Sequence, residues 1–176
     1  MSATDQEAER HLITLAMQYH VAGRCAAVCQ IVPVAGNLLH HAIEMVLKAL
    51  LVRDRGLAGV TKLGHNLVKI WTAAVATYPE LDSTDRRRAI EELDRFKNLR
   101  YPDGVIARGA AIRFGWDRAP PMPTMSVPTY DLVMEDVDEL FQASFVFTGK
   151  NAEFFLAMLN KEARAALRDR NLYPMG

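Results

Sequence analysis

The chain has 176 residues and a formal net charge of zero, with 21 basic and 21 acidic side chains. This length fits one domain with a core large enough to fold alone, and the neutral balance argues against nucleic-acid binding through bulk positive charge. No apolar run reaches the ~18 residues of a membrane span, and the polar start MSATDQEAERH is unlike a secretory signal. Together with only two cysteines, these features predict a cytoplasmic protein that does not enter a membrane.

Two long helices are predicted first. Apolar residues recur at helical spacing over residues 4–32, and Pro33 disfavours helical backbone at the preceding residue, so a break is expected there. A second helix is expected from Val34 to Asp54. It is followed by a loop, RGLAGVTKLG, that ends near His65.

The next segment predicts two shorter helices. HNLVKIWTAAVATY forms the third, which stops before a proline. The fourth starts after LDSTD, where Asp82 or Ser83 can accept hydrogen bonds from the free amides of the first turn, and ends near Tyr101. The third and fourth helices are therefore expected to pack against the first two.

The C-terminal half predicts a long insertion and two more helices. Residues 103–130 are rich in glycine and proline, which favours an extended loop with a small hairpin across VIARGAAIRF. A fifth helix is expected over residues 131–148 and a sixth over residues 151–170. The chain is thus predicted to be a single all-α domain over residues 1–176, an antiparallel up-and-down bundle of five to six helices.

A polar stripe crosses the otherwise apolar second helix. At ~100° per residue its members fall within about 60° of one another; they are Asn37, His41, Glu44 and Lys48. The stripe fits three alternatives. In the first, it is a solvent-facing ribbon with a Glu44–Lys48 pair. In the second, His41 and Glu44 point into a polar cleft, which lies between helices or across a dimer interface. In the third, the stripe forms hydrogen bonds within the core.

Four short motifs in a fixed order resemble the HEPN superfamily over residues 12–102. They are AMQYHVAGRCAA, AIEMVLKALLV, KLGHNLVKIW and RFKNLRYP. The resemblance implies a helical bundle that forms a homodimer. Many members are metal-independent ribonucleases, toxins or defence effectors, whose site is an arginine followed four to six residues later by a histidine.

The chain departs from that ribonuclease motif. Arg95 is followed by Arg100, where the histidine would fall, and then by Tyr101. Arginine keeps its proton at any working pH and cannot act as the base that the family's reaction needs. The resemblance therefore implies a phosphate-binding site in which Arg95 and Arg100 hold phosphate oxygens and Tyr101 stacks on a base, beside the stripe of the second helix. No metal or cofactor is expected.

Two histidines offer an alternative base. His65, in the Gly-His-Asn-Leu turn, or His41 could supply the missing imidazole of a rearranged ribonuclease site. The competing interpretation of the turn is architectural, with His65 docking the third helix onto the second through a hydrogen bond to Glu44. His40 lies beside His41 but projects ~100° away, which argues against a two-histidine metal clamp.

Two further features carry weaker predictions. Cys25 and Cys29 are expected to be small buried thiols and not zinc ligands, because no second ligand pair is present. RFGWDR mixes arginines with Trp116, which fits either contact with single-stranded nucleic acid or a tryptophan folded back onto the core.

Three functions remain open from the sequence. The first is a nucleotide- or RNA-binding HEPN-like protein with weak or absent catalysis, acting as a homodimer in a toxin–antitoxin or defence system beside a cognate antitoxin or nucleotidyltransferase-like partner. The second is a metal-independent endoribonuclease with a rearranged site. The third is a non-enzymatic interaction protein.

Overall fold

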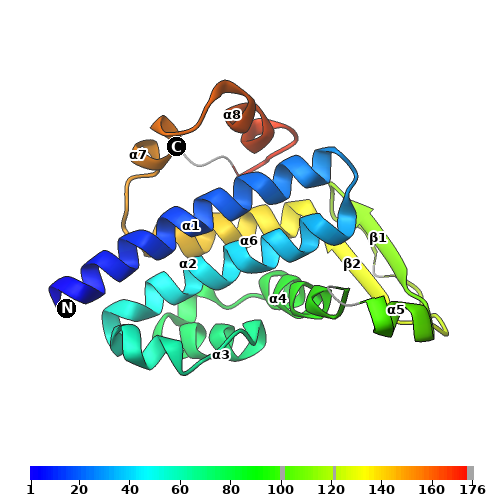
Figure 1. Ribbon diagram of the computed structural model, residues 1–176, viewed down its shortest axis with the longest axis horizontal. Coiled ribbons are helices and arrows are strands. Elements are labelled where there is room, and N and C mark those ends of the chain that lie inside the picture. Colours follow the sequence, from blue (N-terminus) through cyan, green and yellow to red (C-terminus); the bar gives the residue numbers. More distant parts are fainter. Residues whose placement is uncertain (100–101, 121, 174–176) are drawn as a thin grey trace.

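A computed structural model describes residues 1–99, 102–120 and 122–173, and it is predominantly helical (Figure 1). This confirms the helical class, with one addition, a small parallel sheet of two strands. The helices are α1 (Ala3–Val28), α2 (Val32–Thr61), α3 (Leu67–Thr77), α4 (Thr84–Phe96), α5 (Pro102–Arg108), α6 (Met134–Phe147), α7 (Ala152–Ala157) and α8 (Lys161–Arg168). The strands are β1 (Ala111–Gly115) and β2 (Thr129–Val133), and 3-10 turns cover Pro79–Leu81 and Lys97–Leu99.

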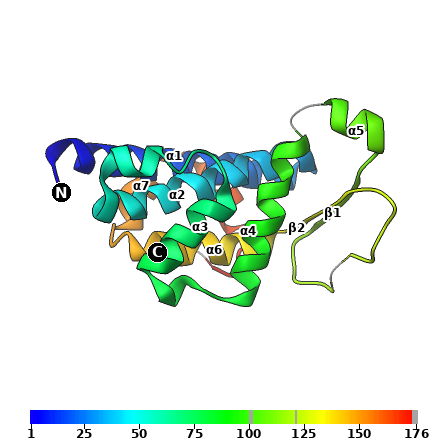
Figure 2. The same ribbon diagram turned by 90° about the horizontal axis from the view of Figure 1, so that it is seen from below.

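Helices α1 and α2 lie side by side and form the centre of the fold (Figures 1 and 2). The predicted break between them is confirmed, with Pro33 in the first turn of α2, where its missing amide hydrogen costs nothing. At the start of α1 the Ser2 hydroxyl accepts a hydrogen bond from the Asp5 amide at 3.1 Å, and the Asp5 carboxylate bonds back to Ser2. Local sequence signals thus set where both helices begin.

Helix α2 extends past its predicted end at Asp54. Gly56 interrupts the helix with a φ of 64°, but helical backbone resumes and continues to Thr61, so the predicted loop is shorter than expected. The Asp5 carboxylate of α1 accepts a hydrogen bond from the Leu57 amide at 2.9 Å and caps the resumed turn. This bond, followed by those to Ser2, holds the pKa of Asp5 below its usual value.

The core lies where α2 packs against α1, α3, α4 and α6. Close approach of α2 and α4 depends on Gly36, because a Cβ atom there would overlap the ring of Phe96. Along α2, the fully buried apolar side chains include those of Leu39, Ile43, Val46, Leu47, Leu50 and Leu51. None of the helices within the described ranges has both the length and the apolar character needed to cross a bilayer.

The predicted hairpin across VIARGAAIRF is wrong. Residues up to Arg108 form α5, and β1 pairs in parallel with β2, from Ala111 opposite Thr129 to Gly115 opposite Val133. The partner strand therefore lies 18 residues further along the chain. Because β2 occupies the residues up to Val133, α6 begins at Met134 and not at Asp131. Together, α5 and the two strands extend beyond the helices (Figure 2).

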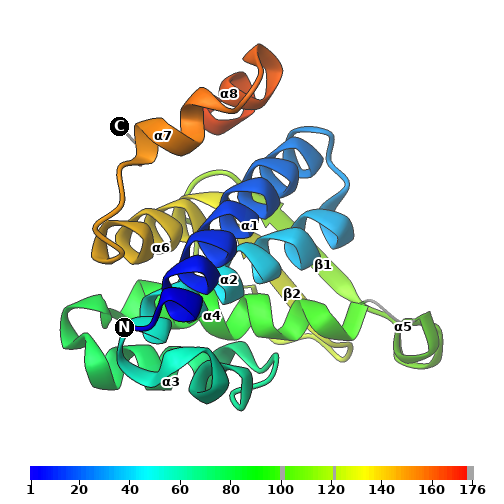
Figure 3. The same ribbon diagram turned by 60° about the vertical axis from the view of Figure 1, so that its left-hand side comes forward.

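The predicted sixth helix is two short helices. Helix α7 ends at Ala157, and α8 starts after Asn160, whose side chain accepts a hydrogen bond from the Ala163 amide at 2.8 Å. Asparagine at this position favours a new helix start over continuation of the old one. The two helices lie across α1, on the far side of the molecule from α3 (Figures 1 and 3).

Candidate functional site

The polar stripe of α2 converges on one buried carboxylate, that of Glu44. Its side chain is 0% exposed, although it belongs to a helix otherwise filled with leucine, isoleucine and valine. Lys48, one turn later, is also buried. The solvent-facing alternative for this part of the stripe is therefore wrong, while the predicted Glu44–Lys48 pair is present, with 2.7 Å between Lys48 Nζ and Glu44 Oε1.

Nitrogen groups from two elements surround the Glu44 carboxylate. Oε1 is 2.7 Å from Nδ1 of His65, in addition to the Lys48 ammonium. Oε2 lies 3.6 Å from Nε2 of His40 and 3.7 Å from Nδ1 of His41, and accepts no hydrogen bond within 3.5 Å from the described residues. This arrangement, the Glu44 cluster, comprises Glu44, Lys48, His40, His41 and His65.

The ionised form of Glu44 is favoured despite its burial. Burial by itself raises the pKa of this carboxyl, but the neighbouring His40, His41 and Lys48 lower it by more, so the pKa lies well below its usual value. A negative charge is therefore held inside the protein at neutral pH. Its counter-charge is the Lys48 ammonium.

His65 reaches Glu44 from the turn before α3. Gly64 turns the chain with a φ of 66°, and Asn66 caps α3 by accepting a hydrogen bond from the Lys69 amide at 2.8 Å. The Asp94 carboxylate of α4 accepts a second bond at this helix start, from the Leu67 amide at 2.9 Å. The docking bond that was predicted between His65 and Glu44 is thus present. It lies at the start of α3, where Asn66 and Asp94 both accept hydrogen bonds from the first-turn amides.

The His65 imidazole is oriented for chemistry at its other nitrogen. A carboxylate can only accept, so Nδ1 carries the proton that is donated to Glu44, and in the neutral ring Nε2 keeps its lone pair. The side chain is 78% exposed, so solvent and ligands reach it. A carboxylate that orients a histidine in this way is also the arrangement that enzymes use to prepare a general base.

His40 and His41 both lie beside Glu44. The position of His40 there was not predicted from the sequence. Nδ1 of His40 donates to the Leu93 carbonyl of α4 at 3.0 Å, and the ring is buried. Residues three and four positions before Glu44 are both its neighbours on a helix, so the two rings approach the same oxygen. His41 is partly exposed, and its ring lies 5.3 Å from that of Tyr19.

The surface around the start of α3 carries basic side chains. Lys62 and Lys69 are exposed on either side of His65 in the chain. In the 3-10 turn that follows α4, Lys97 is partly exposed and pairs with Asp94 at 2.6 Å. The carboxylates nearest to His65 in this network, Glu44 and Asp94, both accept bonds from groups of the protein itself. Lys97 is neutralised by Asp94, but Lys62 and Lys69 make no ion pair with the described residues, so an anionic ligand would meet positive charge here.

The arginine predicted to complete this site points elsewhere. The Arg95 guanidinium pairs with Glu92 at 2.8 Å and lies 5.7 Å from the ring centre of Tyr130 in β2. It makes no hydrogen bond or ion pair with the Glu44 cluster among the residues that the structure describes. Arg100 and Tyr101, the other two predicted ligand residues, lie outside the described residues.

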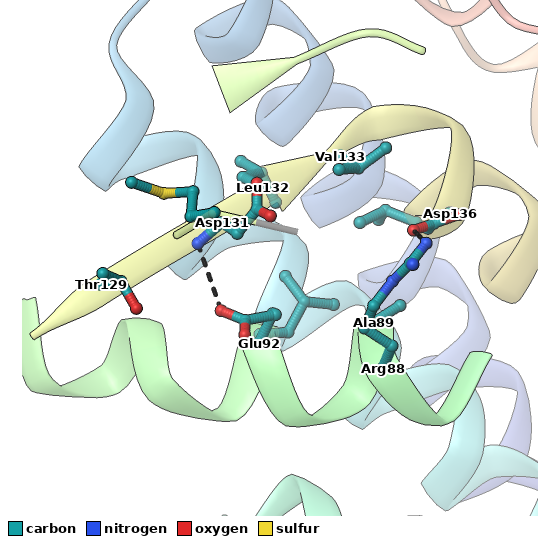
Figure 4. Close-up of a pocket in the computed structure, with 11 residues that line it drawn as sticks. Arg88, Ala89, Glu92, Thr129, Asp131, Leu132, Val133 and Asp136 are labelled. Carbon is teal, nitrogen blue, oxygen red and sulfur yellow. Dashed lines mark hydrogen bonds and ion pairs between the residues drawn. The ribbon is translucent and has the colours of Figure 1, made fainter. Parts of the chain in front are cut away.

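A small cavity of about 100 Å³ lies between α4, β2 and the start of α6 (Figure 4). Its charged residues satisfy one another: Arg88 pairs with Asp136 at 2.5 Å, and Asp131 is held by Arg113. Glu92 accepts a hydrogen bond from the Asp131 amide at 3.2 Å (Figure 4). These contacts brace α4 against the sheet, and we assign the cavity a structural role.

A second buried ionic cluster joins α1, α6 and α8, and it was not predicted from the sequence. Arg24 is 0% exposed and bonds to Asp138, to the Ala166 carbonyl at 2.8 Å and to the Asp169 carbonyl. Asp138 also accepts from Nε2 of His20 at 3.0 Å. Burial lowers the pKa of His20, although the bond to Asp138 works in the opposite direction. The spacing of His20 and Arg24, four residues apart on one helix, was the available signal.

Cys25 and Cys29 are exposed, so the prediction that they are buried is wrong. Cys25 lies in the last turn of α1, and Cys29 is the residue that follows the helix end. No group of histidine, cysteine and carboxylate side chains in residues 1–99, 102–120 and 122–173 is arranged to hold a metal ion.

Trp116 folds back against the core, and its ring centre lies 5.7 Å from the Arg24 guanidinium. Of the two interpretations of RFGWDR, this agrees with the tryptophan folded back onto the core.

Comparison of the chain with protein-family models, with curated proteins and with solved structures finds no match.

Proposed function

We propose that this chain is a HEPN-like, antiparallel helical bundle that binds the phosphate of a nucleotide or RNA at the Glu44 cluster, with weak or absent catalysis. The observation that carries the proposal is the exposed His65 imidazole, oriented by a buried carboxylate and set among Lys62, Lys69 and Lys97. Phosphate oxygens are strong acceptors and favour such groups. The proposal includes a cytoplasmic homodimer in a toxin–antitoxin or defence system, beside an antitoxin or nucleotidyltransferase-like partner.

The start of α3 adds to the attraction for phosphate. Backbone amides at the start of a helix carry partial positive charge, which favours anions within the first turn. Two of these amides, those of Leu67 and Lys69, are already satisfied by Asp94 and Asn66. The ligand is therefore expected to be held chiefly by side chains, with His65 and Lys69 contributing most.

Phosphate binding is tested by the affinity for AMP, ATP and a short single-stranded RNA, measured by isothermal titration calorimetry. His65→Ala and Lys69→Gln are each expected to weaken binding about tenfold or more, because each removes a hydrogen bond to a charged group. Both side chains are exposed, so the variants are expected to fold normally.

Arg108→Gln is the matched control, since it removes an exposed cation on α5 and should leave affinity within about twofold. Arg95→Ala and Arg100→Ala show whether the arginines of the HEPN-like motif take part. Ligand affinity that is unchanged in His65→Ala and Lys69→Gln would contradict the proposed site. A protein that binds none of the three ligands would favour the interaction-protein alternative.

The hydrogen bond between Glu44 and His65 also favours a second candidate, a metal-independent endoribonuclease. Nε2 of His65 would take the proton of a ribose 2′-hydroxyl, and that oxygen would attack the adjacent phosphorus. The bond to the 5′-oxygen would break, leaving a 2′,3′-cyclic phosphate, and the departing 5′-oxygen would take a proton from solvent water, while the protonated His65 would return its proton to solvent. His41 is the alternative base, and nearby lysines would stabilise the charge on phosphorus.

RNA cleavage is checked by incubating purified protein with a labelled RNA in the presence of a chelator. Cleavage should persist with the chelator and fall at least 100-fold in His65→Ala, as expected when a general base is lost. His11→Ala is the matched control, because His11 is an exposed histidine on α1. Cleavage that survives in His65→Ala and disappears in His41→Ala would transfer the role to His41. Absence of cleavage would leave the binding proposal as the better account.

A further inference from the structure

An apolar groove lies between the first half of α1 and α7, far from the Glu44 cluster. It has a volume of about 620 Å³ and adjoins a second cavity of about 380 Å³. The two share Phe154 and Arg10 as lining residues, so they lie next to each other, and together we call them the trough. A volume of this size falls within the range of about 300–1,000 Å³ that is typical of small-molecule sites.

The walls of the trough are made of large apolar side chains that the fold leaves uncovered. Phe154 is 62% exposed and Met158 is 59% exposed, although the next aromatic, Phe155, is buried in the core. Opposite them lie Leu12 of α1 and Leu57 of the resumed turn of α2. Exposed apolar side chains that line a hollow can bury the apolar part of a small ligand.

The trough is lined by charges of both signs, and one of its cations is unpaired among the described residues. Arg10 lines both cavities, and its guanidinium makes no hydrogen bond or ion pair with the described residues. His11 lies beside it, and Glu7 is the carboxylate at the mouth of the larger cavity. In the smaller cavity Glu9 is already paired, with Arg53 at 2.6 Å and Lys150 at 3.1 Å. Arg10 is thus available to a carboxylate.

We propose that this trough binds an aliphatic monocarboxylate of medium or long chain. The alkyl chain lies along Leu57, Met158 and Phe154, and the carboxylate pairs with Arg10, whose planar guanidinium matches it in a two-bond arrangement. The tail gains affinity from apolar burial, and the unpaired Arg10 guanidinium favours an acid over an amine of equal length. This site is independent of the function proposed for the Glu44 cluster.

The test is calorimetric titration of the intact chain with octanoate, decanoate and dodecanoate, each below its critical micelle concentration. Each added methylene is expected to tighten binding two- to fourfold, the upper value being that of full burial. Dodecyltrimethylammonium should bind at least tenfold more weakly than dodecanoate. Equal affinity for the two, or no dependence on chain length, would overturn the proposal.

Variants locate the site. Phe154→Ser and Arg10→Gln should each weaken dodecanoate binding about tenfold, and both alter exposed side chains, so thermal unfolding should confirm that the fold is retained. Val146→Ser and Arg108→Gln, which change exposed residues outside the trough, are the matched controls and should stay within twofold.

Two outcomes would assign the trough to another occupant and overturn the proposal. One is a dimer, detected by light scattering, that Phe154→Ser dissociates while dodecanoate does not bind. The other is sedimentation with anionic phospholipid vesicles without affinity for the free acids.

Discussion

Replacing Arg24 by alanine is expected to lower the free energy of unfolding by about 3–5 kcal/mol, the cost of breaking a buried ion pair from one side. The substitution leaves the Asp138 carboxylate buried beside a histidine whose neutral form is favoured. It also removes the hydrogen bonds to the carbonyls of Ala166 and Asp169 that tie the end of α8 to α1. Urea unfolding followed by circular dichroism measures the loss.

The control for Arg24→Ala is Arg87→Ala. Arg87 forms a 2.6 Å pair with Asp82, but its side chain is largely exposed, so a much smaller loss of unfolding free energy is expected. Amide exchange gives an independent signal, because α8 should lose protection in Arg24→Ala while α3 keeps it. A loss of less than 1 kcal/mol for Arg24→Ala would show that the burial of this pair has little energetic consequence.

Glu44→Ala is the second substitution with a large expected effect, again about 3–5 kcal/mol, because Lys48 is then buried without a counter-charge. His65 loses its partner at the same time, so α3 should dock less firmly. Glu44→Gln keeps the shape of the side chain and a hydrogen-bond acceptor for His65, so it should lower the free energy of unfolding by less than Glu44→Ala. Glu44→Gln combined with Lys48→Met removes both charges and should recover part of the loss.

The pH dependence of stability gives a sharper test of Glu44. Its pKa is lower in the folded protein than the usual 4.5, so between that value and the folded pKa the unfolded chain binds a proton that the folded protein does not. Unfolding is therefore favoured as the pH falls below about 4.5, and the contribution of ionised Glu44 is fully present above it. Glu44→Gln should flatten the decline in unfolding free energy over this acidic range, measured by urea titrations from pH 5 to pH 2.5. An unchanged slope would mean that Glu44 does not carry the depressed pKa.

The parts of the fold that local sequence determines were predicted well. Pro33 separates α1 from α2, and Ser83, one of the two predicted caps, caps α4, because each acts on its own turn. Predictions failed where distant residues intervene. The predicted hairpin was wrong because β1 pairs with a strand beyond a long loop. The continuation of α2 past Gly56 was missed because the Leu57 amide, where the helix resumes, is capped by the distant Asp5.

The candidate site was predicted in part for the same reason. Glu44, Lys48 and His41 share a helix, so their neighbourhood followed from spacing, and the turn before α3 suggested His65. The direction of Arg95 did not follow, because it depends on β2, whose position no local pattern revealed. The exposure of Cys25 and Cys29 was also missed, since small thiols fit a buried and an exposed helix face equally well.

Asp5 makes two segments into one cooperative unit. Its single carboxylate accepts a hydrogen bond from the Ser2 amide at the N-cap of α1 and another from the Leu57 amide in the turn that follows Gly56, more than fifty positions later. Fraying at the start of α1 would withdraw the acceptor of Leu57, and fraying of the resumed turn would leave one oxygen of Asp5 without its donor. Opening at this end of the molecule should therefore occur as a paired event and not as two separate fluctuations. Through Leu57, that event reaches the wall of the apolar groove.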